Sequence, residues 1–116
     1  MSSIDHAIRF IKKSWKEGKT LKEIAHDHRL DPGNLDREFR KAEGITVKQY
    51  VDARRKRAFE RALRRGGRFG YEIGTLLGFK NDLAFYRWVR RAYGKSFRSL
   101  LRNPRPPSKE DEAGND

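Results

Sequence analysis

The sequence predicts an all-α protein of two helix-turn-helix subdomains, with about seven helices in total, joined by a long basic linker helix. Three observations support this fold class. Apolar residues recur at spacings of three and four along most of the chain, as they do on one face of a helix. Capping residues and glycines divide that pattern into short segments. No stretch alternates apolar and polar residues for long enough to form a strand.

Three short helices are expected in the first subdomain, which covers residues 1–45. Their ranges are 4–15, 21–28 and 32 to about 42. Their start signals are Ser3 as a cap, Thr20 with Glu23 as a capping box, and Asp31 as a cap followed by Pro32 at the first helical position. Gly18 and Gly44 end the first and third helices, because glycine readily adopts the left-handed conformation that closes a helix.

The linker helix is expected over residues 47–64, within a linker region of residues 46–65. Thr46 caps this helix, and the pair Gly66 and Gly67 ends it. Its middle reads RRKRAFERALRR, which is strongly basic. The residues expected to face inward are Val47, Tyr50, Val51, Ala58, Ala62 and Leu63.

The second subdomain, residues 66–102, begins with a short helix over residues 69–77. Gly70 and Gly74 give this segment a poor helix propensity. Its apolar residues nevertheless recur at helical spacing. The residues expected to face the core are Phe69, Ile73, Leu76 and Leu77.

Two more helices complete the second subdomain. One runs between the cap Asn81 and the stop Gly94, and Ser96 caps the other, over residues 97–102. Residues 103–116 are rich in proline and then acidic. They are therefore expected to form a disordered tail.

The charge of the chain narrows the classes of function. The 116 residues include 28 Lys and Arg against 16 Asp and Glu, a formal net charge of +12. Residues 1–102 hold 26 basic and 12 acidic side chains, so their net charge is +14. An excess of this size in a small domain points to a polyanionic partner, usually nucleic acid. No segment has the apolar face of a helix that lies on a membrane, and no apolar run approaches transmembrane length.

Catalytic and metal-binding patterns find little support. The chain has no cysteine, which rules out disulfides and cysteine zinc sites and fits a reducing cytosol. His26 and His28 lie on different sides of a helix, so we do not expect a metal pair there. No Ser/His/Asp arrangement, glycine-rich phosphate loop or carboxylate pair stands out, and no signal peptide is evident. We therefore expect neither an enzyme nor a cofactor.

Two segments share one plan of short helix, turn, second helix and glycine. The equivalent triplets in their second helices are Leu35, Arg37 and Phe39, and Phe85, Arg87 and Val89. In each triplet the arginine lies between two core residues at i−2 and i+2, so its side chain points away from the core. Each segment is therefore a helix-turn-helix candidate whose second helix can enter the major groove of DNA.

On these motifs the sequence resembles the DNA-binding domain of the AraC/XylS family of bacterial transcription regulators, over about residues 4–101. The matching residues are Leu21, Ile24, Ala25, Leu35, Arg37, Phe39, Gly44, Thr46, Tyr50, Arg55, Leu63, Ile73, Gly78, Phe79, Phe85, Arg87, Gly94 and Ser96. Four positions depart from the family pattern. Arg29 stands where the family commonly has glycine, and Gly70 where it usually has a β-branched core residue. Lys56 stands where the linker helix is often apolar, and Phe97 replaces a common proline.

The resemblance implies a DNA-binding transcription regulator that inserts two recognition helices into successive major grooves on one face of double-stranded DNA. We expect it to act stand-alone, without an effector domain, as a monomer in the bacterial cytoplasm and at the nucleoid. RNA polymerase is a further candidate partner. Two alternatives remain open: a weakly specific architectural DNA-binding protein, and an adaptor that contacts RNA polymerase or another protein through the same fold.

The resemblance also implies that base edges are reached from the first turns of each second helix. The candidates for base readout are Asn34, Asp36, Arg37, Asp82, Leu83, Tyr86 and Arg87. Arg37 and Arg87 are favoured, because arginine can donate two hydrogen bonds to O6 and N7 of guanine. Asp36 and Asp82 are acidic beside phosphates, and Gly33 has no side chain to read with. Such surfaces would read few bases, so we expect relaxed specificity.

Candidate phosphate contacts lie at helix starts and on basic side chains. Free N–H groups and the helix dipole favour anions at helix starts. The candidates are Thr20, Lys22, Arg40, Lys41, Thr46, Lys48, Lys80, Asn81, Arg90, Arg91, Lys95 and Ser96. Together they predict a DNA affinity that falls steeply with salt.

Overall fold

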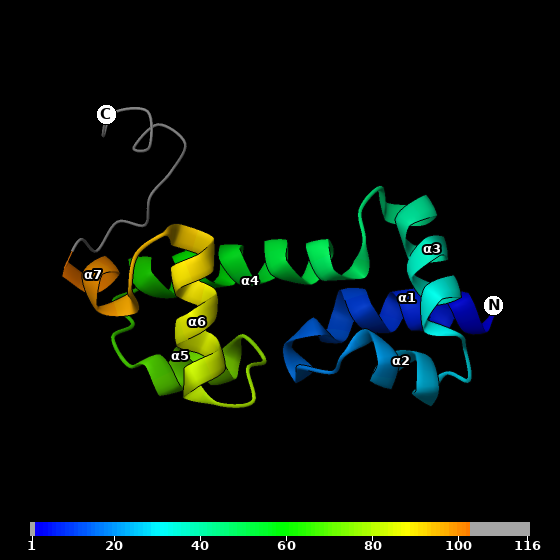
Figure 1. Cartoon of the computed structure of the whole chain (residues 1–116), viewed down its shortest axis with the longest axis horizontal. Coiled ribbons are helices and arrows are strands. Elements are labelled where there is room, and N and C mark those ends of the chain that lie inside the picture. The colour runs from blue at the N-terminus through cyan, green and yellow to red at the C-terminus, as the bar shows by residue number, and fades with distance from the viewer. Residues whose placement is uncertain (1, 103–116) are drawn as a thin grey trace. The chain divides into compact units, whose positions relative to one another are not determined.

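The computed structural model describes residues 2–102 (Figure 1). Its helices are α1 (Ser3–Ser14), η1, a short 3-10 helix (Trp15–Glu17), α2 (Leu21–Asp27), α3 (Pro32–Glu43), α4 (Val47–Arg64), α5 (Gly70–Leu76), α6 (Asp82–Tyr93) and α7 (Phe97–Arg102). Residues 2–102 contain no strand, so the predicted all-α class is confirmed. The predicted disordered tail, residues 103–116, lies outside the described residues.

Contacts between residues divide the chain into two compact units, unit 1 from Met1 to Arg55 and unit 2 from Lys56 onward. Unit 1 contains α1, α2 and α3, and unit 2 contains α5, α6 and α7. The boundary falls inside α4, so the helix predicted as a linker contributes residues to both units. A separate linker region over residues 46–65 stays a prediction.

Unit 1 is built on α1, α2 and α3, each of which contacts the other two. Their apolar faces meet the first turn of α4 in one core. The buried members of this core are Ala7, Ile11, Ile24, Ala25, Leu35, Phe39 and Val47. Leu35 and Phe39 are fully buried, so they anchor α3. A salt bridge of 3.2 Å between Lys12 and Glu43 links α1 to α3 at the surface, where such a pair contributes at most about 1 kcal/mol.

The start of α1 differs from the prediction by one residue. Ser2, not Ser3, is the cap: its hydroxyl accepts a hydrogen bond from the Asp5 N–H at 3.1 Å, and the Asp5 carboxylate accepts one from the Ser2 N–H at 3.4 Å. Asp5 decides the position, because it stands three residues after Ser2 and completes a capping box there. The other predicted caps, Thr20, Asp31, Thr46, Asn81 and Ser96, are confirmed.

The turns between α2 and α3 and between α5 and α6 have the same backbone. The Leu30 N–H donates to the Ala25 carbonyl at 2.8 Å, and the Phe79 N–H donates to the Gly74 carbonyl at 2.9 Å. The residue that closes the first helix is left-handed in both turns: Arg29 has φ 57° and Gly78 has φ 85°. Glycine adopts this conformation without strain, whereas arginine adopts it at a cost of about 1–2 kcal/mol.

Phe59 is the centre of the unit 2 core, although the prediction for α4 omits it. Its side chain is fully buried. Its ring centroid lies 5.3 to 6.1 Å from those of four other aromatic rings, in Phe85, Trp88, Tyr93 and Phe97. Aromatic pairs at such separations stabilise a core beyond the area they bury. Phe59 stands within a charged run, which obscures the apolar period there.

Of the four residues of the α5 segment that were predicted to face the core, Ile73 and Leu77 are buried, as predicted. Phe69 and Leu76 are 58% and 61% exposed, so the prediction that they face the core is wrong. The buried residues of this segment are Gly70, Ile73, Gly74 and Leu77. Phe69 is the cap residue, just before the first helical residue of α5. Leu76 lies three residues after Ile73, at the edge of the buried face of the helix.

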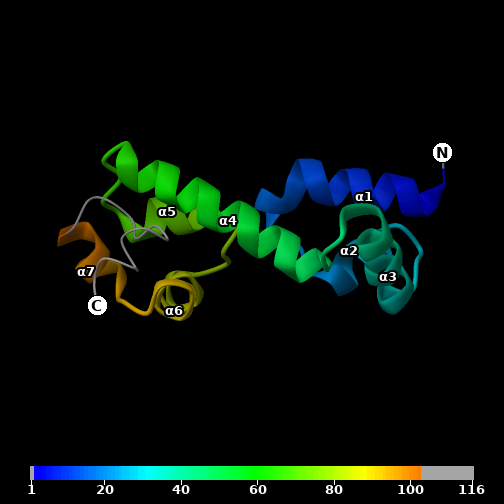
Figure 2. The same ribbon diagram turned by 90° about the horizontal axis from the view of Figure 1, so that it is seen from above.

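Two glycines let α5 and α6 of unit 2 approach each other closely (the two helices are labelled in Figure 2). A β-carbon added at Gly74 would lie 3.1 Å from Cβ of Phe85. One added at Gly70 would collide with the hydroxyl of Tyr86. The departure from the family pattern at Gly70 therefore has a physical reason, because the small residue makes room for the ring of Tyr86.

Candidate nucleic-acid interface

The outer side of α3 is the first predicted readout surface. Asp31 caps the helix, and its carboxylate accepts a hydrogen bond from the Asn34 N–H at 2.9 Å. Arg37 is exposed, and the residues two before and two after it, Leu35 and Phe39, are fully buried. Nη1 of Arg37 donates to Oδ1 of Asn34 at 3.3 Å. The structure therefore brings two predicted readout residues, Asn34 and Arg37, together one turn apart.

This pair leaves Arg37 able to bind a base. A guanidinium has five N–H donors, and the side chain of Asn34 uses one of them. The remaining donors can form the paired hydrogen bonds that arginine makes to O6 and N7 of guanine. Asn34 thus orients the guanidinium on the outer side of α3 without neutralising its charge.

Asp36, in the first half of α3, links this helix to the start of α4. Its Oδ1 accepts a hydrogen bond from the Val47 N–H at 2.9 Å, and the side chain is half-buried. Val47 is the first residue of α4, where N–H groups lack partners within the helix and a negative charge is favourable. Asp36 therefore acts as a cap in this structure, and base readout by its carboxylate stays a prediction.

The outer side of α6 is the second predicted readout surface. Asn81 caps the helix by accepting a hydrogen bond at 2.8 Å from the N–H three residues later. Asp82 and Leu83 are exposed in the first turn. Arg87 is exposed, and the residues two before and two after it are fully buried, as around Arg37. The two arginines thus have equivalent positions in their own units.

Tyr86 stands directly before Arg87, as Asp36 stands directly before Arg37. Its ring covers Gly70 and lies 6.0 Å, centroid to centroid, from the ring of Phe97 at the start of α7. In each unit, therefore, the residue before the arginine contacts the start of the next helix. Tyr86 is 42% exposed, so part of its ring still reaches solvent, and its contact with a base stays a prediction.

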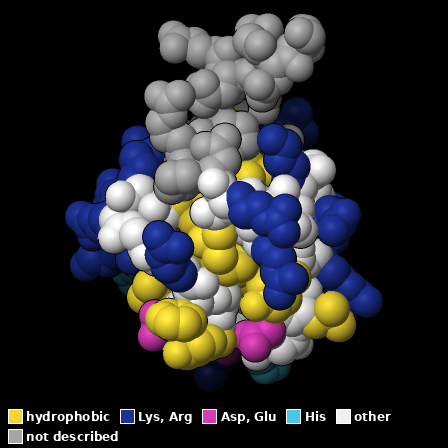
Figure 3. Space-filling model, turned by 90° about the vertical axis from the view of Figure 1, so that its left-hand side faces the viewer, with side chains coloured by type: hydrophobic (Ala, Val, Ile, Leu, Met, Phe, Trp, Pro, Cys, Tyr) yellow, Lys and Arg dark blue, Asp and Glu magenta, His cyan; other side chains and the backbone are white. Residues whose placement is uncertain are grey.

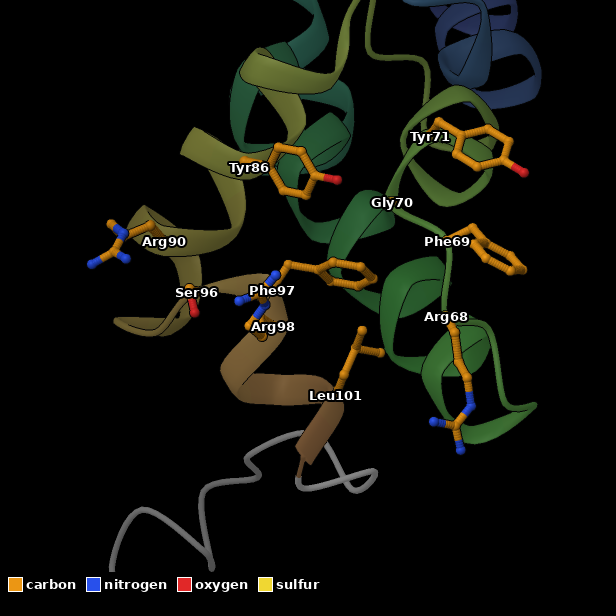
Figure 4. Close-up of a pocket in the computed structure, with 10 residues that line it drawn as sticks. All are labelled: Arg68, Phe69, Gly70, Tyr71, Tyr86, Arg90, Ser96, Phe97, Arg98 and Leu101. Atoms are coloured by element: carbon orange, nitrogen blue, oxygen red, sulfur yellow. The ribbon is translucent and has the colours of Figure 1, made fainter.

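A groove of about 490 Å³ lies beside Tyr86 in unit 2 (Figure 4). It is bounded by residues 68–71 on one side and by the end of α6 and the residues 96–101 on the other. Two predicted phosphate contacts, Arg90 and Ser96, line it together with Tyr86. The structure therefore gathers three of the predicted site residues of unit 2 around one groove.

The same groove contains residues that the sequence analysis missed, namely Arg68, Phe69 and Arg98. Arg68 and Phe69 precede α5, and Arg98 is the second residue of α7. No motif marks them, because only the fold brings these two segments together. Their residue types gave a weak signal of a nucleic-acid site, since arginine beside aromatic residues is common in such sites.

The predicted phosphate contacts at helix starts already serve as caps. Side-chain oxygens of Thr20, Thr46, Asn81 and Ser96 each accept a hydrogen bond from the N–H three residues later. The O–H hydrogens of the three hydroxyl groups can still donate to a phosphate. The predicted basic contacts are all exposed: Lys22, Arg40, Lys41, Lys48, Lys80, Arg90, Arg91 and Lys95. Lys41 also forms a salt bridge of 3.1 Å with Glu38.

In unit 1, the pKa values of Lys19, Asp27 and Arg55 are shifted from their ordinary values. The hydrogen bond of 2.7 Å between Lys19 and Asp27 lowers the pKa of the Asp27 carboxyl and raises the pKa of the Lys19 ammonium. Burial lowers the pKa of the Arg55 guanidinium, and the charge of Asp52 opposes this effect. Arginine starts so high that Arg55 keeps its positive charge at pH 7.

Within residues 2–102, no three His, Asp or Glu side chains lie close enough together to hold a metal ion. No helix in this range combines the length and the apolar character needed to cross a bilayer.

The two units define a protein with two helix-turn-helix motifs. In each motif a first, bracing helix (α2 or α5) is followed by a second helix (α3 or α6) that carries an exposed arginine. A family model described as a helix-turn-helix domain matches residues 24–103. The chain therefore belongs to the AraC-type helix-turn-helix family, which confirms the resemblance in its sequence. No curated protein matches the chain.

Solved structures share this fold. The C-terminal domain of the two-component response regulator YesN from Fusobacterium nucleatum is similar with a TM-score of 0.69 at 21% identity, over 84% of this chain and 95% of that chain. The C-terminal domain of AraT, a response regulator from Geobacillus stearothermophilus, gives 0.71 at 21% identity, over 94% and 90%. The DNA-binding domain of the global transcriptional factor AdpA, solved with a target DNA, gives 0.68 at 18% identity, over 89% and 93%.

Proposed function

We propose that the protein is a DNA-binding transcription regulator that places α3 and α6 in successive major grooves of double-stranded DNA. The equivalence of Arg37 and Arg87 is the observation that carries this proposal. Each arginine is exposed on the second helix of its motif, and each is flanked by fully buried residues that fix its direction. A rigid helix with a guanidinium on its outer side suits readout of guanine in the major groove.

Charge supports a nucleic-acid partner. Residues 1–102 have a net charge of +14, and every basic side chain proposed to contact phosphate is exposed. Phosphate contacts of this kind supply most of the affinity of such proteins without specifying sequence. The similar domain of AdpA was solved in complex with a target DNA.

Each part of the interface has its own task in this proposal. Arg37, oriented by Asn34, and Arg87 read base edges, and Leu83 contacts the methyl group of a thymine. The caps and the basic side chains bind phosphates and set the register of the helices on the duplex. We further propose that units 1 and 2 together suffice for binding, with the protein acting as a monomer.

The test is a selection of bound duplexes from a random pool, followed by titrations at one fixed salt concentration. Arg37→Ala and Arg87→Ala should each weaken binding of the selected duplex by roughly 5- to 150-fold, because a bidentate contact contributes about 1–3 kcal/mol. Each should also relax the preference at one base pair. Arg9→Ala and Arg61→Ala remove exposed arginines outside the proposed surface and serve as matched controls.

Two results would contradict the readout proposal. The first is a double variant, Arg37→Ala with Arg87→Ala, that keeps both affinity and sequence preference. The second is an effect of the control substitutions as large as that of the readout substitutions. The first result would assign base readout to other residues, and the second would favour a weakly specific DNA binder. A chain that binds no duplex would favour the adaptor alternative, in which the same fold contacts RNA polymerase or another protein.

One observation favours a weakly specific mode of DNA binding as the second candidate. Asp36 is engaged with α4, and Tyr86 packs on Gly70 and Phe97, so few side chains remain to read bases. Footprinting on a long duplex separates the two modes. A discrete protected site supports the specific regulator, and diffuse coverage supports the weakly specific binder.

A further inference from the structure

The groove of unit 2 has an apolar floor. Phe97 is buried at its base, the ring of Tyr86 forms one wall, and Phe69 stands on the opposite side (Figure 4). Phe69 is 58% exposed, so much of its ring is open to an occupant of the groove. Leu101, in the last turn of α7, completes the apolar lining.

Cationic side chains edge the same groove. Arg68, Arg90 and Arg98 all line it, and all three are exposed. Figure 3 shows this combination on one face, where hydrophobic side chains lie between Lys and Arg side chains. Guanidinium groups bind carboxylates and phosphates through paired hydrogen bonds. The groove therefore suits an occupant that has both anionic groups and compact apolar groups.

A segment with both kinds of group follows the groove in the sequence. Residues 103–116, which lie outside the described residues, read NPRPPSKEDEAGND. This segment has three prolines near its start, followed by Glu110, Asp111, Glu112 and Asp116. Proline-rich segments dock in aromatic-lined grooves with little loss of entropy, and the carboxylates complement the arginines.

We propose that the groove of unit 2 is a docking site for residues 103–116 of the same chain, which compete there with the backbone of DNA. The distance is short, because α7 ends at Arg102 and Leu101 already lines the groove. An extended segment of this length spans about 40 Å, at roughly 3.1 Å per residue, so it can turn back into the groove. Attachment also gives it an effective concentration in the millimolar range.

Competition follows from the residues that the two occupants share. Arg90 and Ser96 are proposed phosphate contacts and also line the groove. A carboxylate on these residues excludes a phosphate from the same place. Docking itself is independent of the proposed function, and only the competition rests on it.

The experiment compares full-length chains. In one variant Glu110→Gln, Asp111→Asn, Glu112→Gln and Asp116→Asn neutralise the segment. A groove variant carries Arg68→Gln and Arg98→Gln. A matched control carries Arg64→Gln and Arg65→Gln, two exposed arginines of unit 2 that do not line the groove. Backbone amide signals of residues 68–71 and 96–101 are followed by NMR, and binding of one fixed duplex is titrated.

Neutralising the carboxylates of residues 103–116 should shift the amide signals of the groove residues. In the unmodified chain, about 0.5 M salt should shift these signals in the same direction, because salt screens the same charge pairs. Neutralising the segment should raise duplex affinity about three- to tenfold, both in the otherwise unmodified chain and in the control chain with Arg64→Gln and Arg65→Gln. In the groove variant the same neutralisation should change affinity by less than about twofold. The difference between backgrounds separates docking from the general effect of net charge.

Three outcomes would overturn the proposal. Groove signals that do not respond to neutralisation show that the segment does not occupy the groove. An equal gain in affinity in every background shows a general charge effect. Shifts that depend on protein concentration identify a second copy of the chain as the source of the segment. If no variant binds any duplex, the proposed function fails, but the NMR comparison still decides whether the segment docks.

Discussion

The ring of Tyr86 fills the space that a β-carbon on residue 70 would need. Cε1 and Cζ of Tyr86 would both lie 2.9 Å from such an atom, well inside van der Waals contact. Gly70 and Tyr86 therefore form a matched pair across α5 and α6. The relationship explains why a weak helix former begins the bracing helix of unit 2.

Gly70→Ala is expected to lower the free energy of unfolding by about 1 kcal/mol. Overpacking costs about 1–3 kcal/mol and outweighs a gain in helix propensity of roughly 0.5–1 kcal/mol. In a Tyr86→Ala background, the same substitution should instead be neutral or stabilising, because the ring is gone. Chemical denaturation of the four chains measures the coupling. An identical effect of Gly70→Ala in both backgrounds would show that the ring of Tyr86 moves aside at no cost in free energy.

Arg29→Gly is expected to stabilise unit 1. Arg29 has φ 57°, a conformation that costs about 1–2 kcal/mol for a residue with a β-carbon. Part of this gain is lost to the greater freedom of glycine in the unfolded chain, so we expect a net rise of about 0.5–1 kcal/mol. Arg29→Ala is the control, since it removes the charge but keeps the strain. Equal stabilities of the two variants would mean that the turn is unstrained.

Asp36→Ala is expected to destabilise unit 1 by about 1–2 kcal/mol, because the Val47 N–H loses its acceptor. Asp36→Asn keeps an acceptor oxygen and should cost less than half as much. Thermal unfolding of both variants tests this difference. If Asp36→Ala unfolds with the same free energy as the unmodified chain, the cap is unimportant and readout becomes the better role for Asp36.

The Lys19–Asp27 pair makes a pH-dependent contribution. The Lys19 ammonium lowers the pKa of the Asp27 carboxyl below its unfolded value of about 3.9. The stability that the Asp27 carboxylate contributes is therefore present above about pH 3.9 and is lost as the pH falls through the folded pKa. Lys19→Gln should return the pKa of Asp27 toward its unfolded value, whereas Lys16→Gln should not. An NMR titration of the Asp27 carboxyl carbon measures this pKa directly. If the pKa of Asp27 is the same in Lys19→Gln as in the unmodified chain, the pair does not form.

Salt dependence separates phosphate contacts from base contacts. Arg40→Gln and Lys41→Gln should each reduce the slope of log affinity against log salt by roughly 0.9, with little change in sequence preference. Arg87→Ala should mainly change the preference. Titrations at several salt concentrations test both statements. A slope that neither substitution alters would remove Arg40 and Lys41 from the interface.

Helix starts were predictable because their causes are local. The capping box of Thr20 and Glu23 spans three residues, so the sequence alone contains both partners. The error of one residue at α1 has the same local origin, since Ser2 and Ser3 are both capping residues and Asp5 decides between them.

The spacing of apolar residues predicted the burial of Ile73 and Leu77, but not the burial of Gly70 and Gly74 in α5. Whether residue 70 is buried depends on Tyr86, which lies sixteen residues later and on another helix. Burial of Phe59 likewise depends on rings contributed by α6 and α7. The arginines of the groove come from two separate segments, so no spacing rule connects Arg68 with Arg98.

The two tryptophans of the chain make the two units separately observable. Trp15 is buried in unit 1 and Trp88 in unit 2. Indole fluorescence is sensitive to the loss of a dry environment. A Trp88→Phe chain would therefore report the opening of unit 1 alone, and a Trp15→Phe chain that of unit 2. Two emission curves recorded in the same denaturant series would show which unit unfolds first, or whether the two units unfold in one cooperative transition.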